Sequence, residues 1–335
     1  MPIDTHAHYF PPRLIESLED RAADLGISLV RRPPACQCAL AFEYGLEVRP
    51  FPARLIEPVA DRLKAMDATG IDRQVLSTWA DIFAYALPRE KSILWHRTLN
   101  DAMSRLVAEA PGRFSFLASV PLPHSAESAA ELERSVRDLG AVGAVVCANV
   151  DEVNLGEVAL DELWAATTEL DVGVLIHPAH PSQGGRARRY GLAQIAQYTY
   201  DTTLSMGSLI FAGVLDRFPG LRPLVCHGGG STPYLAGRFD IMHARQDRRA
   251  SGNVALNPPS DYLQRFYYDT ILHAPKTLKF LSDTVGVDCI VLGTDYSFPP
   301  ADNDSLATVR AAGFSSGEIA RIAEENPRRL FPRLP

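Results

Sequence analysis

The 335-residue chain has no block of like charge and no hydrophobic run long enough to cross a membrane. Its formal net charge is −7, from 33 basic and 40 acidic residues. The most apolar long stretch, LSMGSLIFAGVL at residues 204–215, is shorter than the roughly 20 residues that a membrane-spanning helix needs. These features argue against a protein that binds nucleic acid or that binds or spans a membrane.

The start of the chain, MPIDTHAH, lacks the basic segment followed by an apolar one that marks a secretory signal peptide. The five cysteines are scattered, and only one residue separates Cys36 from Cys38, which is a poor spacing for two zinc ligands. We therefore expect reduced thiols and a cytoplasmic protein.

Short apolar runs alternate with amphipathic segments along the whole chain. The runs that are typical of strands lie at residues 2–6, 74–79, 113–122, 141–150, 172–178, 221–228, 265–271 and 289–296. Several are apolar throughout, as expected when a parallel sheet is covered on both faces. Eight strands, each followed by a helical pattern, predict a single α/β domain over residues 1–335, a (β/α)8 barrel of the TIM type. An open doubly wound sheet is the alternative, and the lack of G-x-G-x-x-G after an early strand disfavours it.

Two segments interrupt this alternation. Residues 25–55 contain the proline-rich stretch RRPPACQCALAFEYGLEVRPFP, and a polar loop, PAHPSQGGRARRYG, occupies residues 178–191. An insertion as long as the first one usually has a purpose. We expect residues 25–55 to form a small lid after the first strand.

Polar residues stand at the ends of four predicted strands. His6 and His8 are two apart on the first strand, so their side chains point to the same face. His177, His227 and Asp295 end the fifth, sixth and eighth strands. A lone histidine after an apolar run is more often a core residue, but a barrel gathers all its carboxyl ends at one mouth. A divalent cation there would account for the whole set and offset the cost of a buried carboxylate.

The histidine and aspartate donors restrict which metal ion can bind and indicate whether it has a catalytic or a structural role. Imidazole nitrogens with one carboxylate suit zinc, with manganese, iron or cobalt as alternatives. Three histidines and an aspartate leave room for a water molecule, whose pKa zinc lowers toward about 7. A closed structural site rarely has such an open position, so the pattern favours an enzyme.

The motifs DTHAHYF, LIHP, CHGGG, GTDYSFP and ENPRRLF resemble those of the amidohydrolase superfamily. Within it, the chain is most similar to the metal-dependent decarboxylases typified by 2-amino-3-carboxymuconate-6-semialdehyde decarboxylase. The motifs occur in the same order and at similar spacing over nearly the whole chain. The resemblance implies a metal-dependent carboxy-lyase with a barrel fold.

This resemblance implies a role for each residue at the strand ends. His6, His8, His177 and Asp295 match the metal ligands of the family. His227 matches an acid/base histidine that stands beside the metal without being a ligand. We therefore expect His227 and Asp295 to be the catalytic residues.

Two arginines match substrate-binding positions of the family. Arg49, in LEVRPFP, matches a lid arginine that holds the substrate carboxylate, and a bidentate guanidinium suits that task. Arg238, in LAGRFD, matches an arginine that reaches into the site of the neighbouring subunit. The second match implies a homodimer.

Lysine is scarce, and its positions bear on the number of metal ions. Only Lys64, Lys91, Lys276 and Lys279 are present. Many hydrolases of the superfamily hold two metals bridged by a carboxylated lysine at the end of the fourth strand. The predicted fourth strand, AVGAVVCANV, has none, so the resemblance implies one divalent ion.

The leading hypothesis is nonoxidative decarboxylation of an aromatic or muconate-like carboxylic acid. The metal would polarise an enol or phenol oxygen, His227 would move the proton, and the arginines would orient the carboxylate. The alternative is metal-dependent hydrolysis of an amide or lactone, or hydration of an unsaturated acid; a structural metal without catalysis is third. The sequence does not specify the substrate, and His180 and His273 would alter it if they line the pocket.

Overall fold

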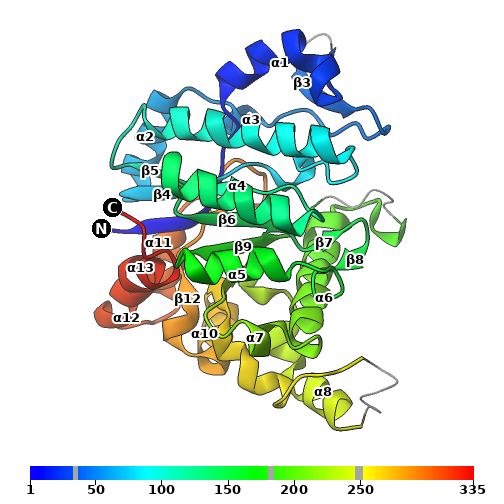
Figure 1. The fold of residues 1–335 in the computed structure, drawn as a ribbon. Helices are drawn as coiled ribbons and strands as arrows, with labels where there is room; N and C mark the ends of the chain where they lie inside the picture. The colour runs from blue at the N-terminus through cyan, green and yellow to red at the C-terminus, as the bar shows by residue number, and fades with distance from the viewer. Residues whose placement is uncertain (33–36, 180–184, 246–251) are drawn as a thin grey trace.

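The computed structural model describes residues 1–32, 37–179, 185–245 and 252–335 (Figure 1). Eight parallel strands form one sheet in the order β1, β4, β5, β6, β9, β10, β11 and β12. Each of them overlaps one of the eight predicted strand segments. The strands are Ile3–His8 (β1), Arg73–Ser77 (β4), Phe114–Ser119 (β5), Gly143–Cys147 (β6), Gly173–His177 (β9), Arg222–Val225 (β10), Tyr267–Asp269 (β11) and Ile290–Val291 (β12).

The first and last strands of this sheet meet. The backbone N–H of Thr5 donates to the carbonyl of Leu292 at 2.8 Å. Beyond β12, Ala7 and Tyr296 form a parallel bridge. The sheet is therefore a nearly closed barrel, and the predicted (β/α)8 fold is confirmed.

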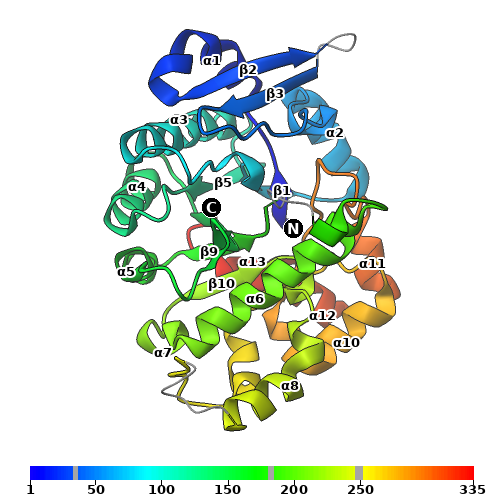
Figure 2. The same cartoon turned by 90° about the vertical axis from the view of Figure 1, so that its right-hand side faces the viewer.

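Helices cover the outside of the barrel, and Figure 2 shows α3, α4, α5, α10 and α11 arranged around the strands. Side chains alternate between the barrel interior and this helix layer, so both faces of a strand are covered. Every residue of β1, β4, β5, β6 and β9 is accordingly buried. The helices are α1 (Pro12–Leu25), α2 (Val59–Thr69), α3 (Arg89–Val107), α4 (Ser125–Asp138), α5 (Asp161–Glu169), α6 (Tyr198–Phe211), α7 (Val214–Arg217), α8 (Thr232–Arg245), α10 (Pro275–Val285), α11 (Ser305–Ala311), α12 (Ser316–Ala320) and α13 (Asn326–Leu330).

Short helical turns fill several connections. They are η1 (Ala53–Leu55), η2 (Ala80–Ile82), η3 (Gly185–Ala187), η4 (Ala193–Gln197), η5 (His227–Gly229), η6 (Pro259–Arg265), η7 (Val287–Cys289) and η8 (Arg321–Glu325). A small hairpin, β7 (Asn149–Val150) and β8 (Val153–Asn154), follows β6. Among the described residues, no helix is both long and apolar enough to cross a bilayer.

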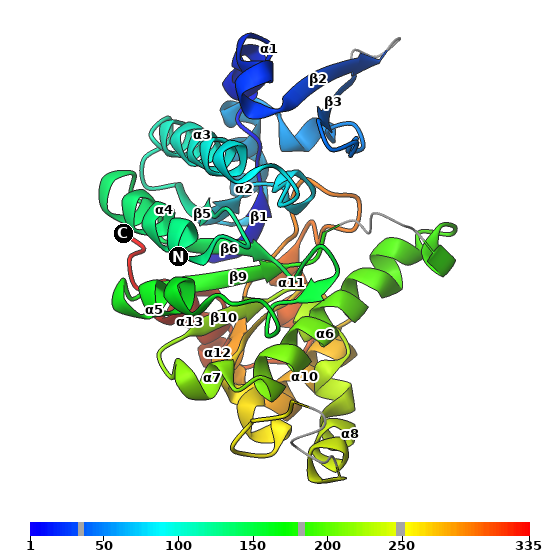
Figure 3. The ribbon, with the colours of Figure 1, turned by 45° about the vertical axis from the view of Figure 1, so that its right-hand side comes forward.

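The segment after β1 contains a second antiparallel hairpin, made of β2 (Ile27–Arg32) and β3 (Gln37–Phe42). This hairpin and α1 lie together at one end of the molecule (Figure 3). The segment predicted as an insertion, residues 25–55, contains this hairpin. Its action as a lid stays a prediction, as does the assignment of the whole chain to one domain.

The insertion has its own apolar cluster, separate from the main barrel core. Leu18 of α1, Leu40 of β3 and Trp95 of α3 belong to this cluster. Phe51 stacks on Phe10, with ring centroids 4.8 Å apart, and so joins the end of the insertion to the segment just after β1. Buried aromatic pairs of this kind add to the stability that burial alone provides.

His96 of α3 generates a prediction about acid stability. Burial lowers the pKa of its imidazole to about 3, whereas the same group in the unfolded chain titrates near 6.5. Below pH 6.5 the unfolded chain therefore takes up a proton that the folded protein excludes, so the free energy of unfolding falls as the pH falls. From pH 7 to pH 5 this group should cost about 2 kcal/mol.

Replacement of His96 by Gln, which keeps a donor for the Phe83 carbonyl 3.0 Å away, should remove that part of the pH dependence. The measurement is urea unfolding at pH 7 and pH 5, on metal-free wild type and His96→Gln. An equal loss of unfolding free energy in both proteins would show that His96 does not carry the effect.

Candidate metal centre and active site

Four polar side chains meet at the carboxyl end of the barrel. His6 and His8 come from β1, His177 ends β9, and Asp295 follows β12. Each offers one ligand atom, and these atoms all lie within 4.8 Å of one another. All four residues are at most 5% exposed. The structure thus brings together the four residues predicted as metal ligands.

The donor atoms face one another at short range. Nε2 of His6 lies 3.0 Å from Nε2 of His8, and Oδ1 of Asp295 lies 3.2 Å from Nε2 of His8. Nε2 of His177 and Oδ1 of Asp295 are buried without a hydrogen-bond partner within the described part of the chain. Buried polar atoms are normally satisfied, so these orphan atoms fit a bound cation. Three imidazole nitrogens and one carboxylate oxygen suit a divalent ion with an open position.

The outer nitrogen of each histidine is tied to the protein. Nδ1 of His6 lies 2.7 Å from Oδ2 of Asp269, and Nδ1 of His8 lies 2.9 Å from Oγ of Ser77. Nδ1 of His177 donates to the carbonyl of Pro178 at 2.6 Å. Since that bond places the proton on Nδ1, the Nε2 lone pair of His177 is free for a metal.

The protonation states also favour a cation. Burial lowers the pKa of His8, and burial together with the neighbouring imidazoles lowers the pKa of His177 well below its usual value. Burial alone would raise the pKa of Asp295, but the neighbouring imidazoles of His227, His8 and His6 outweigh burial and hold this pKa well below its usual value. At neutral pH the centre therefore presents a carboxylate at Asp295 and neutral imidazoles at His8 and His177, the forms that bind metal. Burial alone would lower the pKa of His6, but Cys226 and Asp269 outweigh burial and raise this pKa well above its usual value, so a metal ion that binds there displaces a proton.

Asp269 is a site residue that the sequence analysis missed. It ends β11 and is fully buried. Besides meeting His6, its carboxylate accepts the backbone N–H groups of His227 and Gly228, each at 2.9 Å. One carboxylate thus orients a metal ligand and holds the turn that carries His227. Its signal in the sequence was a carboxylate at the end of a buried strand, the same signal that identified Asp295.

His227 stands beside the ligand cluster. Its Nε2 lies 3.9 Å from Oδ2 of Asp295, and its side chain is 14% exposed, more than those of the ligands. Its backbone φ is +54°, a conformation that a non-glycine residue keeps only when its surroundings hold it. The position fits an acid/base group that reaches the substrate space without joining the ligand set.

Arg49 lies at the rim of the site. Its guanidinium carbon is 5.0 Å from the centre of the Trp79 ring and 5.3 Å from that of Phe298. The Phe298 ring in turn lies 5.0 Å from the ring of the ligand His8. Nε of Arg49 is 3.7 Å from Oδ2 of Asp81. The insertion thus places the guanidinium of Arg49 near the metal centre, beside the rings of Trp79 and Phe298.

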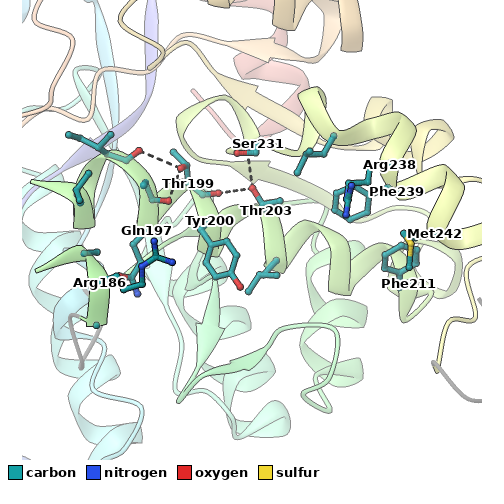
Figure 4. Close-up of a pocket in the computed structure, with 17 residues that line it drawn as sticks. Arg186, Gln197, Thr199, Tyr200, Thr203, Phe211, Ser231, Arg238, Phe239 and Met242 are labelled. Atoms are coloured by element: carbon teal, nitrogen blue, oxygen red, sulfur yellow. Dashed lines mark hydrogen bonds between the residues drawn. The ribbon is translucent and has the colours of Figure 1, made fainter.

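Arg238 lies elsewhere in the single chain. It is on α8 and lines a groove of about 1110 Å³ between α6 and α8. Figure 4 shows Arg238 and Phe239 of α8 on one side of this groove and Tyr200 of α6 on another. None of the four predicted ligands lines the groove. One chain therefore does not bring Arg238 to its own metal centre.

The sequence also indicates His180 and His273 as residues that would alter the substrate if they line the pocket. His273 follows β11 and is exposed, with a φ of +56°. His180 lies outside the described residues.

The sequence matches the model of a known family. A family model described as amidohydrolase matches residues 3–333. The chain belongs to the amidohydrolase family. Membership agrees with the resemblance that the sequence motifs indicate.

Individual relatives confirm the resemblance to the decarboxylase branch. The chain is 31% identical over 300 residues to 2-amino-3-carboxymuconate-6-semialdehyde decarboxylase of Dictyostelium discoideum, covering 89% of this chain and 82% of that protein. It is 28% identical over 319 residues to gamma-resorcylate decarboxylase of Rhizobium sp. (strain MTP-10005), covering 89% and 94%. Among solved structures, 5-carboxyvanillate decarboxylase from Sphingomonas paucimobilis superimposes with a TM-score of 0.81 at 25% identity, covering 99% and 98% of the two chains.

The Asp269 contact predicts a graded effect on metal binding. In Asp269→Asn, Nδ1 of His6 loses its anionic partner, and the affinity for zinc should fall about 10- to 100-fold. The measurement is competition with a chelator, with circular dichroism to confirm the fold. The double variant His6→Ala/His8→Ala is the control, since it should be folded and bind no metal. Full metal retention in that control would disprove the site, whereas unchanged affinity in Asp269→Asn would disprove only the orienting contact.

Proposed function

We propose that the protein is a metal-dependent nonoxidative decarboxylase that acts on an aromatic or muconate-like carboxylic acid. The observation that carries this proposal is His227, placed beside a three-histidine, one-aspartate centre but outside its ligand set. Relatives named as decarboxylases of a carboxymuconate semialdehyde and of gamma-resorcylate support it. Both named substrates are unsaturated or aromatic acids.

One divalent ion fits the centre, and we propose zinc, with manganese, iron or cobalt as alternatives. His6, His8, His177 and Asp295 would hold it. When bound, such an ion would supply Lewis-acid chemistry, stabilising negative charge on an enol or phenol oxygen of the substrate. Strand β6 ends in Cys147 and has no lysine that could bridge a second ion.

Decarboxylation needs a proton donor, and we assign this role to His227. Decarboxylation breaks the bond between the substrate carbon and its carboxylate, and that carbon then needs a proton as carbon dioxide leaves. His227 can deliver this proton from Nε2, which faces the Asp295 carboxylate 3.9 Å away and lies beside the ligand cluster. Asp295 thus serves both as a ligand and as the partner of the acid.

Arg49 orients the substrate. Its Nε is buried without a hydrogen-bond partner among the described residues, so it has a donor available for a carboxylate. The rings of Trp79 and Phe298 beside it keep water away, and an apolar wall favours the change from a charged carboxylate to neutral carbon dioxide. We propose that the insertion acts as a lid that brings Arg49 to the substrate.

We further propose a homodimer formed through the face of α6 and α8, with Arg238 entering the site of the partner subunit. This face exposes large apolar side chains, among them Ile195 (66% exposed), Tyr200 (57%) and Met242 (44%). Exposed apolar patches of this kind are typical of interaction surfaces. A cytoplasmic location is also proposed, because the five cysteines are scattered along the sequence and favour reduced thiols.

The first test of the proposed activity is release of carbon dioxide by the zinc-loaded protein. The substrates are a panel of aromatic ortho-hydroxy acids and muconate semialdehydes, with metal-stripped protein as the control. His227→Asn should retain its metal and lose about 10²- to 10⁴-fold in turnover, because the proton donor is gone. No release from any substrate, with one ion bound per chain, would contradict the proposal and direct the assay to lactones and amides.

Complementation tests the proposed contribution of Arg238. Arg238→Ala alone should lower kcat/KM with unchanged metal content, whereas Arg310→Ala, at an exposed position on α11, should not. Mixed dimers of Arg238→Ala with His227→Asn should regain activity, because one site then has both groups. A monomer in sedimentation under assay conditions would exclude Arg238 from the active site.

A further inference from the structure

Arg62 of α2 is a charged side chain buried in the barrel wall. It is 0% exposed and is among the largest fully buried side chains. Burial lowers its pKa to about 10, so the guanidinium is still charged at neutral pH. A buried charge is costly unless it is paired and hydrogen-bonded. The partners of Arg62 therefore indicate why the charge is there.

Three donors of the guanidinium reach three different segments. Nη2 donates to the carbonyl of His8 at 2.9 Å, and Nη1 donates to Oγ of Ser297 at 3.0 Å. Nε donates to Oε1 of Gln74 on β4 at 2.7 Å. Ser297 Oγ itself donates to the carbonyl of His8 at 2.7 Å. One side chain thus ties the last residue of β1 to the loop that follows β12.

The hydrogen-bonded chain continues through Gln74 to a buried carboxylate. Nε2 of Gln74 donates to Oδ2 of Asp4 at 2.9 Å. Oδ1 of Asp4 accepts the backbone N–H of His6 and that of Thr294, each at 3.1 Å. Oγ1 of Thr294 donates to Oδ2 of Asp4 at 2.6 Å. His6 is a predicted ligand, and Thr294 directly precedes another.

The loop held in this way has an unfavourable backbone. Asp295 has a φ of +55° and Ser297 a φ of +105°, and neither is glycine. Such conformations persist only where the surrounding structure holds them. The ring of Tyr296, between these two residues, lies 4.1 Å from the guanidinium carbon of Arg62, close enough for a cation–π contact. Side-chain contacts to Arg62 thus come from two successive residues of the strained loop.

We propose that Arg62 is a positioning residue for the metal centre. Its guanidinium fixes the end of β1 against the loop after β12, and through Gln74 and Asp4 the same chain of bonds reaches the backbone at His6 and Asp295. Three of the four ligands thereby keep their mutual placement. The proposal rests on the proposed metal centre but not on the substrate or the reaction.

The test compares two buried arginines of the barrel wall. Arg62→Met removes the donors and keeps the apolar stem. Arg73→Met is the matched control, because Arg73 is 6% exposed and donates to Oγ of Ser115 near the amino end of β4. The readouts are the dissociation constant for Co²⁺, the visible absorption bands of the cobalt-loaded protein, and the melting temperature.

The expected result is a loss of Co²⁺ affinity of about tenfold or more in Arg62→Met, with shifted absorption bands, because the ligand geometry relaxes. Arg73→Met should be less stable but should bind Co²⁺ as the wild type does, with the same bands. Unchanged affinity and bands in folded Arg62→Met would overturn the proposal, as would equal losses in both variants.

A second variant decides the question if Arg62→Met does not fold. Ser297→Ala keeps the guanidinium, its bond to the His8 carbonyl and its contact with Tyr296, but removes the hydrogen bonds of the Ser297 hydroxyl to Arg62 and to His8. It should lose several-fold in Co²⁺ affinity, and wild-type affinity would overturn the proposal. A wild-type protein that binds no divalent ion would instead disprove the metal centre itself, so the two failures are distinguishable.

Discussion

The carboxylate of Asp295, buried among imidazoles, is the constraint on which the carboxyl end of the barrel depends. A carboxylate with 4% exposure must be ionised and compensated, or protonated and paired. The surrounding histidines hold its pKa well below the usual range, which selects the ionised form. Its backbone N–H also donates to the carbonyl of His6 at 2.9 Å, so the charge and the junction between the first and last strands depend on each other.

Around this charge, the histidine ring nitrogens that face away from the centre contact protein groups, whereas the nitrogens that face the centre are available to a metal ion. The Nδ1 atoms of His6, His8 and His177 are engaged by a carboxylate, a hydroxyl and a carbonyl. Imidazole rings that are already held at Nδ1 lose little conformational freedom when a metal ion binds at Nε2. A site of this kind is organised before its metal arrives, which is what catalysis by fixed charges requires.

The sequence was sufficient for the barrel and for the cluster of ligands, because parallel strands that end in polar residues must present those residues at one edge. Asp269 was missed because the predicted strand segment, RFYYDTI, continues past this carboxylate to an apolar residue. The sequence therefore does not show that the strand ends at Asp269. Arg62 could not be seen at all: its partners His8 and Ser297 are 54 and 235 positions away, and only the closed barrel brings them together. The role proposed for Arg238 would depend on contacts with a second chain, and the pattern of one sequence does not specify such contacts.

The separate apolar cluster under the hairpin has an evolutionary consequence. Because Leu18 and Leu40 belong to a cluster distinct from the barrel core, substitutions at these two positions should disturb the packing around the strands less than substitutions in that core. Arg49 of the insertion lies near the catalytic end, over the rings of Trp79 and Phe298. Selection can therefore change the substrate specificity through the insertion while the residues of the metal centre, and with them the reaction, are conserved.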